Sequence, residues 1–360
     1  MTDFTDMDLR AAVAAGHLSE AQAAQVMALA QARAGTRAGL PVEDEPFEFF
    51  RGFAEIFVAI GLAILFAGLS VGVTLFSGAA AIILLPAVWA AVAWGMAGYF
   101  TLKRRMNLPS MVLVIAFSAG IYLSALTALG NLDAGIRLSV IGAALVTVGA
   151  LSAWYARFKL PFTMAVLASF ALMAIYGATA SLDSLGEMRG VSGVEGLFDL
   201  RQSPQFALST LGFGAVVFAV AMWFDLRDPH RIGRHSATAF WLHLAAAMAL
   251  VNTAAVTMMN LGGTTGMLAT AGVMIVMTLL ALLIDRRSFL TAGIFYVAAV
   301  IIWLVRDAAG LGVMSRTAVI LVLLGGLFTA LGTWWVPLRG ALLRALPDFP
   351  GKNRLPPYVR

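Results

Sequence analysis

The chain contains no cysteine in its 360 residues. This absence excludes disulfides, thiol catalysis, iron–sulfur clusters and zinc sites built on cysteine. The sequence also has no phosphate-binding glycine-rich loop ending in Lys-Ser/Thr, no His-Glu-x-x-His and no Gly-x-Ser-x-Gly. We therefore predict no catalytic residue, no cofactor and no metal site, although membrane enzymes can build sites from scattered residues.

Charged residues are scarce, at 12% of the chain, whereas hydrophobic residues make up 61%. Soluble domains carry about a quarter of charged residues. A soluble fold of this composition would expose an apolar surface to water, and a lipid bilayer removes that problem. Lipid offers no partner for backbone polar groups, so the spans must be helical. The composition thus predicts an all-α, polytopic transmembrane helical bundle.

Apolar stretches long enough to cross a bilayer recur along the chain, since a span needs roughly 20 apolar residues. We interpret them as about ten spans, with the shortest turn at Ser77-Gly78. The predicted spans are 54–76, 78–102, 110–129, 136–155, 161–180, 204–224, 237–259, 265–284, 289–306 and 317–336. The loops of the first and last five spans do not match, so an inverted repeat is not favoured.

The basic residues test this count. With the N-terminus in the cytoplasm, the predicted spans leave only five of the 24 Lys and Arg residues outside, namely Arg137, Arg189, Arg201, Arg306 and Arg316. The bias follows the positive-inside rule, and a missed span would invert every later loop. Segment 1–33 has no apolar stretch followed by a cleavage site, so we expect no signal peptide. We predict a bacterial inner-membrane protein with both termini cytoplasmic.

The first 50 residues differ from the rest because they are polar and rich in alanine. Leu9 and Val13 share one face of a short helix, and Gly16 is a plausible helix end. Ser19 with Gln22 forms a capping-box pattern for a second helix. We predict a cytoplasmic helical hairpin that is too small to hold a core alone. It should dock on the membrane domain, on a copy of itself or on a partner.

The pattern from Leu9 and Val13 through Gly16-His17-Leu18-Ser19-Glu20-Ala21-Gln22-Ala23, followed by many spans, resembles a bacterial membrane-protein family. That family is the one described as domain of unknown function 2157. It has no established activity, so the resemblance implies the layout of a hairpin and a membrane bundle but no functional site.

Few charges are expected within the membrane, where each costs at least a few kcal/mol. Glu55 and Arg137 lie near span ends and can reach the surface, and the absence of a deeper carboxylate counts against proton pumps and ion-coupled carriers. His243 could titrate near neutral pH, but we expect it to bond a neighbouring helix. Asp225, with Asp228 and His230, could in principle bind a metal, but adjacent arginines favour a solvated basic loop that faces anionic lipid.

Hydroxyl and amide side chains recur at helical spacing near the predicted outer ends of four spans. This arrangement could form a polar vestibule, or it could reflect helix-to-helix hydrogen bonds and naturally polar span ends. The vestibule residues are Ser70, Thr74, Ser77, Ser124, Thr127, Asn131, Tyr176, Thr179, Thr253, Thr257 and Asn260. If the four faces point to different sides of the bundle, the vestibule hypothesis fails.

We predict three parts, which are a hairpin and linker over 1–50, a bundle over 51–337 and a cytoplasmic tail over 338–360. The favoured function is a membrane-embedded regulatory or scaffold protein whose residues 1–35 contact a cytoplasmic protein partner. The alternative is a transporter of an uncharged or amphipathic small molecule, and an enzyme acting on a lipid-linked substrate is least favoured. The lipid bilayer is a partner, and no basic run with interleaved aromatics indicates nucleic-acid binding. The oligomeric state is left open.

Overall fold

In the computed structural model, helices account for the architecture of the described chain. The structure describes residues 12–13, 15–19, 22, 26, 50, 52–132, 135–180, 194–227, 234–306, 312–348, 352 and 355. The chain divides into two units, Met1–Asp44 and Glu45–Arg360. No strand occurs among the described residues. The chain is thus all-α over the part that the structure describes.

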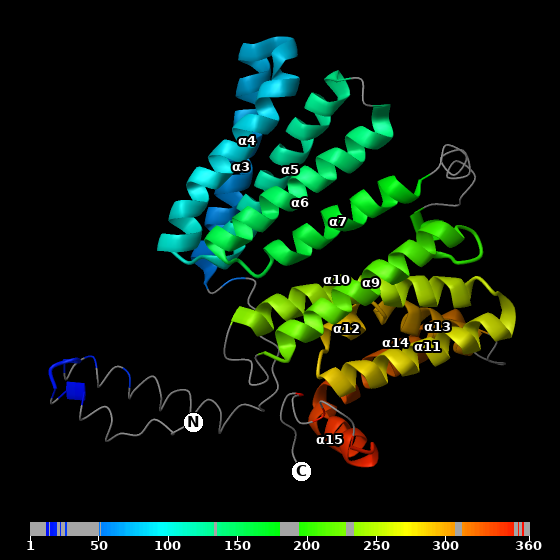
Figure 1. The fold of residues 1–360 in the computed structure, drawn as a ribbon. Helices are drawn as coiled ribbons and strands as arrows, with labels where there is room; N and C mark the ends of the chain where they lie inside the picture. Colours follow the sequence, from blue (N-terminus) through cyan, green and yellow to red (C-terminus); the bar gives the residue numbers. More distant parts are fainter. Residues whose placement is uncertain are drawn as a thin grey trace. The chain divides into compact units, whose positions relative to one another are not determined.

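Unit Glu45–Arg360 contains the apolar helices (Figure 1). In chain order they are α3 (Phe53–Ser77), η1 (Gly78–Ala80), α4 (Ala81–Ala97), η2 (Gly98–Lys103), α5 (Asn107–Asn131), α6 (Gly135–Phe158), α7 (Thr163–Thr179), η3 (Val194–Phe198), α9 (Pro204–Asp225), α10 (Arg234–Met259), α11 (Gly263–Ile284), α12 (Ser288–Thr291), α13 (Ile294–Arg306), α14 (Val313–Thr333) and α15 (Trp335–Ala345).

Seven helical stretches among the described residues are long and apolar enough to cross a membrane. One of them, Phe53–Lys103, covers 51 residues and contains both α3 and α4. Gly78 interrupts it with φ 52, a conformation that glycine adopts at little cost, and the chain reverses direction there. Two further apolar helices, α7 and α13, are shorter. These helices make the chain an integral membrane protein.

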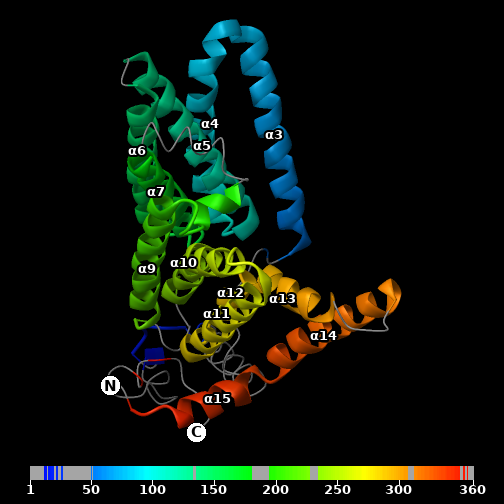
Figure 2. The same ribbon diagram turned by 90° about the vertical axis from the view of Figure 1, so that its right-hand side faces the viewer.

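The helices form two neighbouring packing groups within this unit (Figures 1 and 2). One core gathers side chains of α3, α4, α5 and α6 around Trp154 and Leu113, which are fully buried. The other gathers side chains of α9, α10, α11 and α12 around Val251 and Phe289. Helix α7 contacts both α6 and α9, so it joins the two groups.

Much of the outer surface of these helices is apolar. None of the residues of α14 is buried, and Leu321, Val322 and Val313 are widely exposed. Such a surface is stable only in an apolar solvent, because exposing this area to water is unfavourable. The distribution of side chains is therefore that of a membrane domain.

Two of the predicted span boundaries are wrong. The predicted span over 289–306 is split into α12 and α13, and Gly293 lies between them against Met274 of α11. The predicted span over 317–336 ends earlier, because α14 stops at Thr333 and α15 begins as a separate helix at Trp335. In both places an apolar sequence continues through a bend of the chain, so hydropathy does not reveal the break.

In the N-terminal unit, the structure describes the junction between the two predicted helices. Gly16 takes φ 73, and the backbone N–H groups of His17 and Leu18 donate to the carbonyl of Ala12. This geometry ends a helix on a left-handed glycine. Ser19 and Gln22 make the reciprocal hydrogen bonds of a capping box, at 2.9 Å and 3.2 Å. Most of the predicted hairpin lies outside the described residues, and the hairpin stays a prediction.

Candidate functional site

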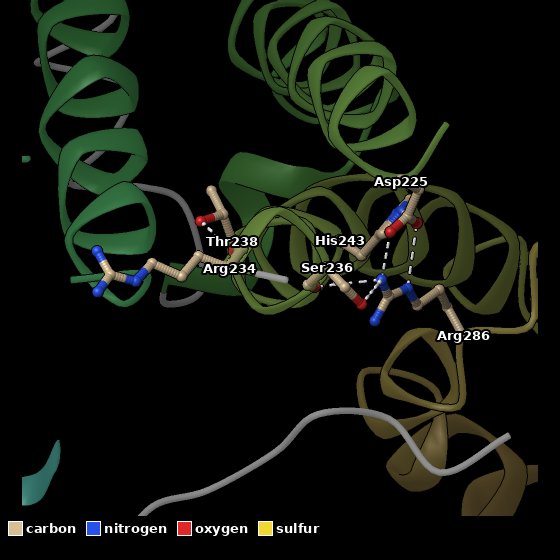
Figure 3. A network of polar contacts seen from close by, with 6 residues as sticks. All are labelled: Asp225, Arg234, Ser236, Thr238, His243 and Arg286. Carbon is tan, nitrogen blue, oxygen red and sulfur yellow. Dashed lines mark hydrogen bonds and ion pairs between the residues drawn. The ribbon is translucent and has the colours of Figure 1, made fainter. Parts of the chain in front are cut away.

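A cluster of buried charged side chains lies where α9, α10 and α11 end or begin (Figure 3). Asp225 is the last residue of α9, Ser236 and His243 belong to the first part of α10, and Arg286 follows α11. Each of these four side chains is buried. Burying an ionised group inside a membrane protein costs free energy, so these side chains must pair with one another.

Asp225 accepts hydrogen bonds from two partners. Nε2 of His243 lies 2.7 Å from its Oδ2 atom. Arg286 donates from Nε to the same oxygen at 3.1 Å and from Nη2 to Oδ1, so the guanidinium binds the carboxylate with two parallel bonds. A carboxylate only accepts hydrogen bonds, so His243 carries its proton on Nε2 in this contact.

Arg286 also binds α10 directly. Its Nη2 atom donates to the carbonyl oxygen of Ser236 at 3.2 Å and to the Ser236 hydroxyl at 3.1 Å. Two residues farther along α10, the hydroxyl of Thr238 lies 3.2 Å from the hydroxyl of Tyr155 on α6. The polar contacts therefore run from the end of α11 through α9 and α10 to the first packing group.

Aromatic rings surround the imidazole of His243. The ring centroids of Phe218 and Phe289 lie 5.4 Å and 6.0 Å from it, and both contacts are edge to face. An apolar surrounding strengthens the hydrogen bond to Asp225 and raises the cost of losing it. The prediction that His243 bonds a neighbouring helix is confirmed.

Asp285, the neighbour of Arg286, connects the cluster to α15. It takes a left-handed conformation with φ 57, which is uncommon for a residue other than glycine. The indole Nε1 of Trp335 donates to its Oδ1 atom at 2.7 Å, and Nε of Arg339 lies 3.7 Å from the same oxygen. The chain turns after α11, so the consecutive side chains of Asp285 and Arg286 reach different helices. Asp285 binds α15, and Arg286 binds α9 and α10.

We call the side chains that attach these helices to one another the inner cluster; they are Asp225, Ser236, His243, Asp285 and Arg286. Its carboxylates are occupied by guanidinium, imidazole and indole groups, and no described group of three His, Asp or Glu side chains could hold a metal ion. Asp228 and His230, which the sequence offered as possible metal ligands beside Asp225, lie outside the described residues. The chemistry available here is charge pairing and a hydrogen bond that His243 donates to Asp225.

These buried charges were missed in the sequence, where Asp225 and Arg286 were assigned to solvated inner loops. Trp335 is buried with them, at 1% exposure. One signal was present, because a histidine inside a span requires a polar partner and Asp225 is a carboxylate 18 positions before it, at the end of the preceding span. Glu55 also differs from expectation, since it is buried and its Oε2 accepts the backbone N–H groups of Asn107 and Leu108 at the start of α5.

The predicted vestibule residues bond along their own helix or to an adjacent one. Ser70 of α3 accepts the indole N–H of Trp89 of α4 at 3.2 Å. Thr179 of α7 pairs with Ser209 of α9 at 3.0 Å. The Thr257 hydroxyl accepts the N–H of Leu200 beyond η3. Other bonds of this kind are those of Thr74 to the Ser70 carbonyl, Thr127 to the Leu123 carbonyl, Tyr176 to Thr210, Thr253 to the Ala249 carbonyl and Asn260 to Asp199.

The remaining vestibule residues are Ser77, Ser124 and Asn131. Ser77 ends α3 beside an open, largely apolar groove that is also lined by Gly68, Gly72 and Phe76. The Ser124 hydroxyl is buried without a hydrogen-bond partner among the described residues, and Asn131 is exposed at the end of α5. Among the described residues, no hydrogen bond joins the sets of α3, α5, α7 and α10 to one another. The vestibule stays a prediction.

The chain matches no family model, no curated protein and no solved structure in the comparisons made. The resemblance of residues 9–23 to domain of unknown function 2157 therefore also stays a prediction.

Proposed function

We propose that this integral membrane protein is a regulatory or scaffold protein of the bacterial inner membrane, with about ten spans and both termini in the cytoplasm. The ten apolar segments expected from the sequence each overlap a described helix. The bias of basic residues toward one side of these segments supports the orientation. On this topology Asp225, Asp285 and Arg286 lie at the cytoplasmic ends of their helices.

One observation carries the proposal, namely that the inner cluster attaches helices to one another. Arg286 holds α9 and α10, and Asp285 holds α15. A carrier would be expected to place exchangeable polar groups along a path, whereas here the charged groups are paired and buried at one end. This arrangement favours a rigid cytoplasmic face on which other proteins assemble.

The predicted hairpin supplies the interaction element of this proposal. Val26 falls in the second helix of the predicted hairpin, and its apolar side chain is exposed. An exposed apolar side chain on a short helical segment suits the groove of a protein partner. We therefore place the cytoplasmic protein partner on residues 1–35.

Cysteine accessibility tests the proposal against the transporter alternative, because the chain has no native thiol. Single cysteines would replace Ser70, Thr74, Thr127, Tyr176 and Thr257 in separate variants. Intact cells would then be treated from outside with a membrane-impermeant maleimide. A cysteine at Gly190, in the longest predicted outer loop, serves as the labelled control, and Thr253→Cys marks a fully buried position one turn from Thr257.

We expect protection at the five test positions and labelling at the Gly190 control. Labelling at most of the test positions, with Thr253→Cys still protected, would show that water enters the bundle, and the transporter would replace the scaffold. The partner is tested separately by a photoreactive residue at Val26. A discrete crosslinked product that is lost when the photoreactive residue is moved to Asp348, which is exposed and lies outside residues 1–35, supports the hairpin interaction, and no crosslink at Val26 would overturn it.

A further inference from the structure

Helix α15 buries one charged residue, Arg339, whereas its exposed side is apolar apart from Arg344 in the last turn. Trp335, Arg339 and Leu343 follow one another at helical spacing, and all three are buried. The opposite stripe consists of Trp334 just before the helix, then Leu338 and Ala341. Trp334 is 59% exposed and Leu338 is 42% exposed.

This distribution differs from the one expected for a helix that lies on a soluble protein, because a charge is buried and most of the exposed side is apolar. There the apolar stripe faces the core and the polar residues face water. In α15 the guanidinium of Arg339 is fully buried, and its Nε atom lies 3.7 Å from Asp285. The charge is satisfied inside the protein, and the outward stripe needs an apolar environment.

The position of α15 along the chain supplies that environment. Helix α14 has 21 residues, which at about 1.5 Å per residue is close to the thickness of the hydrocarbon core. The helix ends at Trp334, where the backbone leaves helical geometry with φ −101 and ψ 17. Tryptophan is favoured at the boundary between acyl chains and headgroups. Helix α15 therefore starts at the surface of the membrane.

The exposed surface of α14 also continues into the outward stripe of α15. Leu321, Val322 and Leu323 of α14 are exposed apolar residues of a membrane-spanning helix, so lipid covers them. Helix α15 follows α14 at a bend of the chain (Figure 2), and Trp334 and Leu338 are further exposed apolar residues there. Lipid is therefore enough to cover the exposed apolar residues of both helices, and no second protein is needed.

We propose that α15 is an interfacial helix whose Trp334, Leu338 and Ala341 stripe is embedded in the cytoplasmic leaflet of the bilayer. Helices of this kind bury one apolar face about 5–10 Å into the boundary between headgroups and acyl chains. The hydrogen bond of Trp335 to Asp285 and the ion pair of Arg339 with Asp285 fix the rotation of α15 about its axis, and this rotation decides which face meets the lipid. The partner of this surface is the bilayer itself.

Spin labels on single cysteines test the proposal in the full-length protein, reconstituted in vesicles of phosphatidylcholine and phosphatidylglycerol. Leu338→Cys and Ala341→Cys carry the label on the outward stripe. Asp348→Cys is the matched control, because the Asp348 side chain is 99% exposed just after the helix. Oxygen, which concentrates in lipid, and a water-soluble nickel chelate are the two relaxing agents, and thermal unfolding confirms that each labelled variant is folded.

We expect labels at positions 338 and 341 to collide severalfold more with oxygen than with the nickel chelate, and the label at 348 to show the reverse. Equal nickel accessibility at 338, 341 and 348 would overturn the proposal, because the stripe would then face water. Protection of 338 and 341 from both agents would also overturn it, because a protein partner or a second copy of the chain would then cover the stripe.

Discussion

The guanidinium of Arg286 binds the carboxylate of Asp225 through two hydrogen bonds, although the residues lie 61 positions apart and on different helices. Both side chains are buried, so the pair joins α9 to the end of α11 without solvent between them.

Removing one charge of the pair should destabilise the protein by more than the pair contributes to stability, because the other charge stays buried without its partner. Arg286→Gln leaves the Asp225 carboxylate buried with reduced compensation, and we expect a loss of about 3–5 kcal/mol in the free energy of unfolding. The double variant Asp225→Asn and Arg286→Gln should lose less than the sum of the two single variants. Reversible unfolding in mixed micelles measures all three, and additive losses would show that the residues are not coupled.

His243 should contribute to stability through its bond to Asp225. His243→Phe keeps an aromatic ring beside Phe218 but removes the donor, and we expect a loss of about 1.5–3 kcal/mol, as for hydrogen bonds to charged groups. His235→Phe is the matched control on the same helix, because His235 is exposed. Equal losses in the two variants would contradict a specific role for the bond.

Substituting the two adjacent tryptophans at the start of α15 should change the free energy of unfolding by very different amounts. Trp335→Phe removes the indole N–H that binds Asp285 at 2.7 Å, and we expect a loss of about 1.5–3 kcal/mol. Trp334→Phe, at the exposed neighbour, should change the free energy of unfolding by less than about 1 kcal/mol. The comparison is made by unfolding in micelles, and a larger loss for Trp334→Phe would refute the assignment of the buried tryptophan.

Helix α5 packs tightly against the backbone of α4 at Gly120. A Cβ atom there would lie 2.5 Å from the carbonyl oxygen of Pro86 and 2.7 Å from the backbone nitrogen of Ala90. Backbone atoms cannot yield as a flexible side chain does, so Gly120→Ala should cost about 1–3 kcal/mol.

The matched control for this contact is Gly149→Ala in α6, where a Cβ atom meets nothing within 4 Å. This variant should be neutral or slightly stabilising, because alanine favours a helix over glycine. Thermal unfolding of both variants in the same detergent decides the comparison. A neutral Gly120→Ala would mean that the two helices separate easily.

Hydropathy was sufficient to locate the apolar helices, because a bilayer demands long runs of apolar residues and penalises every charge within them. The described helices α5, α6, α9 and α11 overlap the spans expected from the sequence. The capping residues Ser19 and Gln22 were also recognisable, since a capping box depends on residues three positions apart. Breaks such as the one at Gly293 were not, because the apolar run continues through them.

The amino-acid sequence by itself determined that the chain is a helical membrane protein, because composition and the length of apolar runs depend on local residues alone. The tertiary structure decided which helices are neighbours and which charges are buried. Lipid and a protein core are both apolar, so a membrane helix can be apolar on every side and its pattern does not mark the face that packs. For this reason the sequence alone suggests loop positions for Asp225, Arg286 and Arg339. The packing of α9, α10, α11 and α15 around them places their charges inside the protein.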